Sequence, residues 1–238
     1  MSIWAIADLH LCFSTPNKTM EIFGEHWLNY TDKLEKNWQN LVKPQDLVLI
    51  PGDISWAMNI QDALVDLNWI HNLPGTKLII KGNHDFWWPS KTKLKSHLPS
   101  SIHFLQNDAF TWNNAIIAGS RLWDTEEFSF PNTCQDKEKM KKIYERELIR
   151  LEMSLMQTSL PQMDKEPFKI CMTHFPPIGL DLKDSKASIL LEKYKVNICI
   201  FGHLHNMPQN TTPFGVKNNV YYKLVSADFI NFSPLLII

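Results

Sequence analysis

The sequence predicts an α/β fold in which two β-sheets of mixed strand direction pack face to face and α-helices flank them on the outside. Short apolar runs of strand length recur along the chain, and segments of helical periodicity separate several of them. Because parallel strands need a crossover connection, this alternation indicates parallel pairing in part of the fold. After residue 107, and again after residue 205, turn residues such as Asn113-Asn114 and Asn218-Asn219 indicate meandering strands instead.

Six apolar runs are predicted strands, and all have the length of buried strands. In chain order they are Ile3–Ala7, Leu47–Pro51, Lys77–Lys81, Ala115–Ala118, Phe168–Thr173 and Val196–Phe201. Three further segments place apolar residues on one helical face, and Asn59 is the expected N-cap of the second. These predicted helices are Thr31–Val42, Asn59–Leu73 and Asp136–Leu160. No internal repeat, low-complexity tract or linker is evident, so we expect a single domain over residues 1–238.

The composition is that of a globular protein whose charges nearly cancel. Of 238 residues 44% are hydrophobic, and 24 Lys and Arg against 25 Asp and Glu give a formal net charge of −1. A non-specific nucleic-acid binder would carry a basic field, so we expect any anionic ligand to be held locally. The first ten residues lack a cationic start and include Asp8 and His10, unlike a signal peptide or membrane span. We therefore expect a soluble cytoplasmic protein with no membrane contact.

The four cysteines are scattered along the chain. They are Cys12, Cys134, Cys171 and Cys199. The absence of a CxxC pair or other short-range pairing disfavours a disulfide scaffold and a thiolate zinc site. We expect free thiols, with Cys171 and Cys199 serving as small core residues.

Polar residues suited to metal binding follow five of the predicted strands. They lie in Asp8-Leu9-His10, Gly52-Asp53, Gly82-Asn83-His84-Asp85, Thr173-His174 and Gly202-His203-Leu204-His205. In open α/β sheets ligands bind outside the carboxyl ends of the strands, so these endings are expected to meet in one crevice. Asp8 and His10 are two residues apart, and in extended backbone this spacing places both side chains on the same side. His203 and His205 have the same spacing, so each pair could chelate one ion.

Asp53 is suited to bridging two cations. Its carboxylate has two oxygens, and the preceding Gly52 lets the chain turn sharply off the strand. In two-metal sites the ions lie about 3.5–4 Å apart and clamp the attacking and leaving oxygens of a displacement at phosphorus. Imidazole and carboxylate donors favour iron, manganese, zinc or nickel over calcium, without selecting among these four.

The five blocks resemble the pattern of the calcineurin-like metallophosphoesterases, which is DxH, GD, GNH(D/E), H and GHxH. All five occur in the family's order between Asp8 and His205. The resemblance implies the metallophosphoesterase fold, a β-sandwich flanked by helices, with a dinuclear metal centre at the strand ends. It implies one ion held by Asp8, His10, Asp53 and His205, and a second held by Asp53, Asn83, His174 and His203.

The resemblance further implies a hydrolase of phosphate esters that acts on a small phosphorylated substrate. A metal-bound hydroxide, bridging or terminal, would attack phosphorus, because coordination can lower the pKa of water to about 7. His84 directly follows the ligand Asn83 and is expected to protonate the leaving oxygen, while Asp85 could orient its imidazole. We expect phosphodiesters to be slightly favoured over monoesters.

Residues outside the blocks are candidates for substrate binding. Arg121 is the only arginine near a predicted strand end, and could grip a phosphate or form a structural ion pair. Trp56, Trp87 and Trp123 follow strand-end motifs, where their rings could stack on a base or cover an apolar group. The segment Leu11–Tyr30 follows a predicted ligand and could be a lid or an ordinary loop.

Other functions remain open at this point. A non-catalytic scaffold on this fold is expected to have lost ligands or the acid histidine, which are all present here. Near-neutral charge disfavours a nucleic-acid hydrolase, and the lack of an amphipathic membrane helix disfavours a lipid-linked nucleotide pyrophosphatase. The second block continues as Gly52-Asp53-Ile54-Ser55-Trp56, whereas protein serine/threonine phosphatases have GDxVDRG. This departure favours a bacterial-type small phosphohydrolase.

Overall fold

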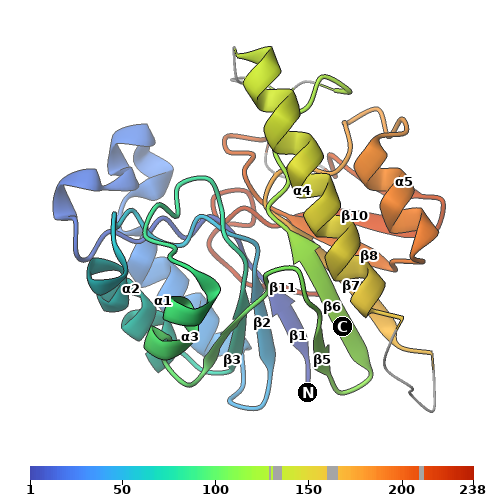
Figure 1. Ribbon diagram of the computed structural model, residues 1–238. Coiled ribbons are helices and arrows are strands. Elements are labelled where there is room, and N and C mark those ends of the chain that lie inside the picture. Colours follow the sequence, from blue (N-terminus) through green and yellow to red (C-terminus); the bar gives the residue numbers. More distant parts are fainter. Residues whose placement is uncertain (129, 131–135, 160–165, 209–211) are drawn as a thin grey trace.

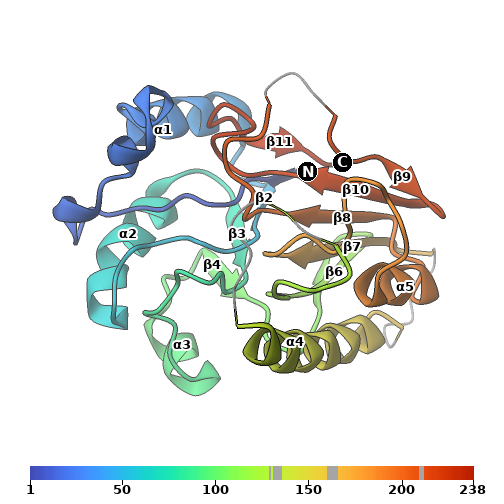
Figure 2. The ribbon, with the colours of Figure 1, turned by 90° about the horizontal axis from the view of Figure 1, so that it is seen from above.

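Two β-sheets pack face to face and helices cover both outer faces, as Figures 1 and 2 show. The computed structural model describes residues 1–128, 130, 136–159, 166–208 and 212–238. The predicted fold class is confirmed. Within the described helices, none combines the length and apolar character needed to cross a membrane.

The first sheet has the strand order β11-β1-β2-β3-β4. Its strands are β1 (Ile3–Ala5), β2 (Leu47–Ile50), β3 (Thr76–Ile79), β4 (Ile102–Phe104) and β11 (Leu235–Leu236). Strands β1 to β4 are parallel, and β11 joins β1 antiparallel at the edge. The outer face is covered by α1 (Tyr30–Leu41), α2 (Ile60–Asn72) and α3 (Lys91–His97). As predicted, the Asn59 side chain caps α2, accepting a hydrogen bond from the Asp62 N–H at 3.0 Å.

The second sheet has the order β5-β6-β7-β8-β10-β9. Its strands are β5 (Phe110–Trp112), β6 (Ala115–Ser120), β7 (Phe168–Thr173), β8 (Ile198–Phe201), β9 (Val216–Lys217) and β10 (Val220–Leu224). The turns at Asn113-Asn114 and Asn218-Asn219 make antiparallel hairpins at the two edges, as predicted. The expectation of meandering strands is wrong for the centre of the sheet, where β6, β7, β8 and β10 are parallel.

Helices make two of the crossovers in the parallel centre of the second sheet, from β6 to β7 and from β7 to β8. These helices are α4 (Lys137–Gln157) and α5 (Lys186–Lys193), which lie together on the outer face of that sheet. Helix α4 was predicted and α5 was not. The α5 segment begins with a capping box in which Ser185 and Ser188 exchange hydrogen bonds. Its eight residues are short for recognition by periodicity alone.

Apolar side chains form a layer between the sheets and one under each group of helices. Alternate residues of the central strands face the partner sheet, among them Ala5, Leu49 and Leu78 from the first and Ile117, Ile170 and Ile200 from the second. Cys12, Cys171 and Cys199 are free thiols, and Cys171 and Cys199 are buried in the core as expected. Cys134 lies outside the described residues.

The two sheets are joined at the carboxyl ends of their parallel strands. The chain leaving β1 forms a parallel bridge from Ala7 to Ser226, which follows β10 of the other sheet. The Ala7 N–H donates to the Val225 carbonyl at 2.8 Å, and the Ala227 N–H donates to the Ala7 carbonyl at 2.9 Å. The ligand-bearing loops of both sheets therefore open onto the same edge of the sandwich.

Candidate metal centre

The predicted ligands lie in loops that hydrogen-bond to one another. The Asp8 N–H donates to the Gly52 carbonyl at 3.1 Å, and the His10 N–H donates to the Asp53 carbonyl at 3.0 Å. In the second sheet, the Gly202 N–H donates to the His174 carbonyl at 3.1 Å. Each loop is thus positioned by its neighbour as well as by its own strand.

The backbone at the ligands differs from the expected extended form. Asp8, His10, Asp53 and His203 have φ angles of 59°, 44°, 52° and 70°. The expectation that extended backbone places each pair on one side is therefore wrong, because β1 ends at Ala5 and β8 at Phe201. The side chains converge because left-handed turns redirect the chain. Asp, Asn and His are the residues, after Gly, that adopt this region most readily.

Two overlapping groups of side chains could each hold a metal ion. In the first, donor atoms of Asp8, His10 and His205 all lie within 4.8 Å of one another. In the second, donor atoms of Asp8, Asp53 and His174 meet the same limit. The Asp53 Oδ2 atom lies 3.8 Å from His10 Nε2 and 3.3 Å from His174 Nε2, and thus between the groups.

Asn83 and His203 join the second group. Asn83 Oδ1 lies 2.6 Å from His174 Nε2 and 3.1 Å from His203 Nδ1. His203 also fixes the first ligand, since its backbone N–H lies 2.9 Å from Asp8 Oδ2. All seven predicted ligands are therefore brought together in one pocket.

The ring nitrogens that meet in this pocket are the ones with lone pairs to donate. His174 Nδ1 lies 2.9 Å from the Pro51 carbonyl, and His205 Nδ1 lies 3.0 Å from Asp228 Oδ1. A nitrogen facing such an oxygen carries a proton, so Nε2 is the atom of each ring that would offer its lone pair to a metal once the ring is neutral. Yet His174 Nε2 faces the Asn83 oxygen, and His205 Nε2 faces His10 Nε2 at 3.3 Å. Lone pairs directed at one another fit cations between them.

Burial and neighbouring charges set the protonation of these groups. Burial lowers the pKa of His10 to about 3 and holds that of His203 well below its ordinary value, so both are neutral donors. Burial raises the pKa of Asp8 to about 6. Burial opposes ionisation of Asp53, but the His174 and His10 imidazoles hold its pKa below the ordinary value. The carboxylate between the two groups is therefore charged.

Asp228 supports the site and was not predicted. It follows β10 and is 4% exposed. Its two oxygens accept from His205 Nδ1 at 3.0 Å and from the Asn206 N–H at 2.9 Å. The rule that ligands gather at strand ends would have identified it, had β10 been recognised as a parallel neighbour of β8.

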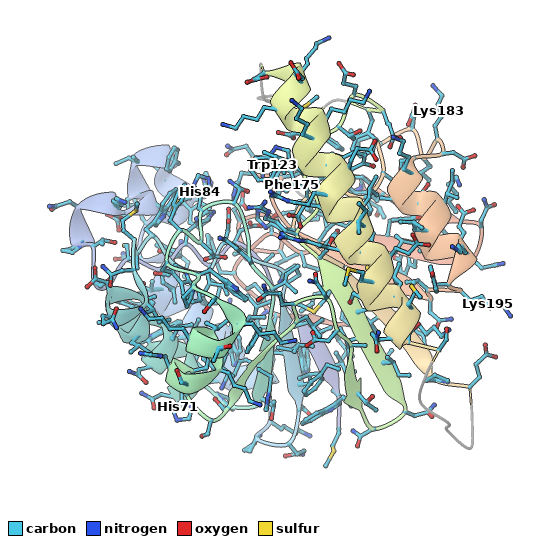
Figure 3. The ribbon with its side chains drawn as sticks, viewed as in Figure 1. His71, His84, Trp123, Phe175, Lys183 and Lys195 are labelled. Atoms are coloured by element: carbon cyan, nitrogen blue, oxygen red, sulfur yellow. The ribbon has the colours of Figure 1, made fainter. Side chains whose placement is uncertain are left out.

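His84 lies beside the ligands without joining either group. Its backbone N–H donates to Asp53 Oδ1 at 2.8 Å, and its ring centroid is 5.7 Å from that of His10. The Trp56 ring packs against both, at 4.5 Å from His84 and 5.0 Å from His10. Figure 3 shows the labelled His84 at the same end of the sandwich as Trp123 and Phe175. Of the predicted tryptophans, Trp56 is the one in contact with these groups.

Within the described part of the chain the Asp85 carboxylate is not hydrogen-bonded to the His84 ring, so the expectation that it orients this imidazole is wrong. Instead, its buried carboxylate accepts five hydrogen bonds, which come from the backbone N–H groups of Gly82, Asp53, Ile54 and Ser55 and from the Trp87 indole. Asp85 thereby ties the loop after β3 to the loop after β2. The carboxylate acts on the site by fixing the backbone of Asp53.

The other residues predicted to bind substrate have different surroundings in the structure. Trp87 is 2% exposed and packs in the core under the first sheet, so the expectation that its ring faces the crevice is wrong. Arg121 forms an ion pair with Glu147 at 3.4 Å, and its guanidinium lies 4.5 Å from the Trp123 ring. In the segment Leu11–Tyr30, the buried Tyr30 hydroxyl donates to the His10 carbonyl at 2.7 Å.

Comparison with known proteins agrees with this geometry. Residues 1–207 match the family model of the calcineurin-like phosphoesterases. Gene 66 proteins of Mycobacterium phages D29 and L5 are 34% identical over 85 and 84 residues, which are 35% and 34% of this chain. These matches span 40% and 39% of the phage proteins, so the chain covers well under half of their length.

Solved structures share the fold over nearly the whole chain. The crystal structure of a phosphopantetheinyl hydrolase from Mycobacterium tuberculosis superposes with a TM-score of 0.59 at 14% identity, covering 100% of this chain and 95% of that one. A protein of unknown function from Aquifex aeolicus gives 0.51 at 16% identity, covering 99% and 95%. With a family model matching most of its residues and metal-binding side chains gathered at the strand ends, the chain belongs to the calcineurin-like phosphoesterase family.

Proposed function

We propose that the protein is a hydrolase of phosphate esters with a dinuclear metal centre. The observation that carries this proposal is the position of Asp53 Oδ2, which lies 3.8 Å from His10 Nε2 and 3.3 Å from His174 Nε2. One carboxylate lies between two groups of donors, as a bridge requires. Imidazole and carboxylate favour manganese, iron, zinc or nickel, any of which suits these donors.

When bound, two cations would neutralise the phosphate and lower the pKa of a water molecule. The chain's own residues supply the rest. Asp53, His10 and His174 would hold the cations against which the ester is positioned, and His84 would protonate the leaving oxygen from beside the ligands. Trp56 packs on the His84 ring at 4.5 Å and restricts its orientation. Asp85 fixes the backbone from which both Asp53 and His84 project.

A leaving-group acid is most useful for phosphodiesters, which expel a poorly stabilised alkoxide, and we therefore propose diesters ahead of monoesters. The substrate is proposed to be a small molecule. Because a solved structure of the same fold is named a phosphopantetheinyl hydrolase, phosphopantetheinyl esters are included among the candidates.

The test compares metal content and rates in three variants. The purified protein with added manganese should hydrolyse bis(4-nitrophenyl) phosphate faster than 4-nitrophenyl phosphate. His84→Asn should keep its metal content and lose about 10²- to 10⁴-fold in kcat on a diester with an alkyl leaving group, and much less on the 4-nitrophenyl esters, whose phenolate leaves without a proton. Asp53→Ala should lose both metal and activity. His103→Asn, an exposed histidine on β4, is the matched control and should behave as wild type.

Two outcomes would contradict the proposal. Equal rates in wild type and Asp53→Ala would assign the activity to a contaminant. Metal loss in His84→Asn would show that His84 is a ligand and not the acid.

A further inference from the structure

A basic cavity lies beside the metal centre and contains none of its predicted ligands. It has a volume of about 340 Å³ and is bounded by the end of β6, by α4 and by the segments that follow β3 and β4. Four cationic side chains line it: Lys81, Arg121, Arg146 and Arg150. Its uncharged lining includes Gln106, Ser120 and Trp88.

The cationic side chains that line this cavity outnumber the carboxylates that line it. Glu147 is the one carboxylate among the lining residues, and it is 2% exposed. Its Oε1 atom accepts from Arg150 at 2.7 Å, and from Arg121 and Arg146 at 3.4 Å each. Four cations thus surround one carboxylate, in a chain whose formal net charge is −1. An anion in the cavity would relieve the repulsion among them.

The cavity shares its backbone with the metal centre. Lys81 precedes Asn83 by two residues, so their Cα atoms are at most about 7 Å apart. The Arg121 carbonyl accepts from the N–H groups of His174 and Phe175, at 3.1 and 2.9 Å. A ligand of ordinary metabolite size could therefore reach both places at once.

Packed aromatic rings connect Arg121, which lines the cavity, with the ligand His203. The Arg121 guanidinium lies 4.5 Å from the Trp123 ring. Trp123 packs on Phe175 at 4.7 Å, and Phe175 packs on the His203 ring at 3.9 Å. Figure 3 shows Trp123 and Phe175 next to each other at the end of the sheets where His84 lies. Phe175 is 2% exposed, so these rings connect the Arg121 side chain with the ligand His203 by packing within the core.

We propose that this cavity binds a second phosphate group of the substrate, so that the substrate carries two phosphate groups joined by a short linker. The inference rests on the proposed function, which places the scissile phosphate at the metal centre. Arginine suits the second position because its planar fork pairs bidentately with phosphate oxygens, and Lys81 adds a point charge.

The first test measures anion binding without metal. The full chain, freed of metal by chelator, is titrated with inorganic phosphate at pH 7.5, by calorimetry and by tryptophan fluorescence. Arg146→Gln/Arg150→Gln should weaken phosphate binding at least tenfold. Lys141→Gln/Lys142→Gln removes the same charge from exposed positions of the same helix and should stay within twofold of wild type.

A second variant covers the case in which the double variant fails to fold. Lys81→Gln leaves all three arginine contacts of Glu147 intact and should also weaken phosphate binding about tenfold. If phosphate binds equally to wild type, Lys81→Gln and the arginine variant, the cluster is only an ion-pair network that holds α4 on the sheet. That result would overturn the inference.

The second test uses the metal-loaded protein and two esters that differ by one phosphate. These are thymidine 5′-(4-nitrophenyl phosphate) and the same ester with a 3′-phosphate. Wild type should show a KM at least tenfold lower for the 3′-phosphorylated ester, and Arg146→Gln/Arg150→Gln should lose this difference while keeping its rate on the plain ester. An equal KM for the two esters in wild type would also overturn the inference. If neither ester is cleaved, the proposed function fails, whereas the phosphate titration still reports on the cavity.

Discussion

Asp228 is expected to control metal affinity although it is not a predicted ligand. Its carboxylate accepts from His205 Nδ1 at 3.0 Å and from the Asn206 N–H at 2.9 Å. The first hydrogen bond fixes the tautomer of His205 and points Nε2 at the pocket, where it lies 3.3 Å from His10 Nε2. Asp228→Asn replaces the carboxylate that holds His205 by an amide of almost the same size and shape.

The expected magnitude follows from the number of acceptors. Asp228 offers one oxygen to each of its two donors, whereas asparagine has one oxygen and turns an NH₂ group toward the other. Either His205 or the Asn206 N–H therefore loses its partner. Loss of such an outer partner reduces metal affinity about 10- to 100-fold, which is about 1.4–2.7 kcal/mol.

Competition with a fluorescent chelator measures this effect, with zinc titrated into metal-free protein. In Asp228→Asn, one of the two zinc sites should have a lower zinc affinity, and the other should keep the wild-type affinity. Asp46→Asn is the matched control, because Asp46 is also a buried acceptor, bonded to the N–H groups of Ser2 and Lys43. It lies at the amino end of β2, so stability should fall without a change in zinc affinity. Wild-type affinity in Asp228→Asn, or an equal loss in Asp46→Asn, would refute the reasoning.

Asp85→Asn should lower the free energy of unfolding by about 3 kcal/mol in urea denaturation, because an amide cannot accept the five hydrogen bonds that the carboxylate accepts. Gly202→Ala should weaken zinc binding about tenfold in calorimetry, since the new Cβ would lie 2.5 Å from Asp8 Oδ2, whereas Gly215→Ala, with its nearest atom at 4.0 Å, should not. Zinc affinity should rise between pH 7 and 9, by at most about tenfold per unit for each proton released. Burial lowers the pKa of His205, but Asp228 and Asp8 raise it to about 9, so the ring must lose a proton to bind metal. A flat pH profile in this range would contradict that assignment.

The strands and helices with strong local patterns were predictable from the sequence. Each of the six apolar runs overlaps a strand, and Asn59 caps α2 as its residue type favours. Short elements were missed because their signals are not local. Strand β10 has the alternating burial of a strand, but its parallel pairing with β8 depends on the long connection that follows β8. The local sequence of a strand does not determine which distant strand it pairs with.

The ligand set was predictable for a different reason. Aspartate, asparagine and histidine after glycine-marked strand ends are chemically conspicuous, and parallel strands bring such ends together wherever the side chains point. The local geometry was not predictable, since the left-handed φ angles at Asp8 and His10 are maintained by hydrogen bonds to the next loop. Asp85 illustrates the same limit, because its five donors come from two loops.

The arrangement of the ligands ties metal binding to the packing of the two sheets. Asp8, His10, Asp53 and Asn83 follow strands of the first sheet, whereas His174, His203 and His205 follow strands of the second. Left-handed backbone at a non-glycine residue costs roughly 1–2 kcal/mol, so the ligand loops carry strain that the packed sandwich must hold. Cations held between the sheets would oppose that cost, since a ligand at about 1,000 times its Kd stabilises the folded state by about 4.1 kcal/mol. The site is therefore a property of the assembled sandwich, because each of the two donor groups combines residues of the first sheet with a histidine of the second, His205 in one group and His174 in the other.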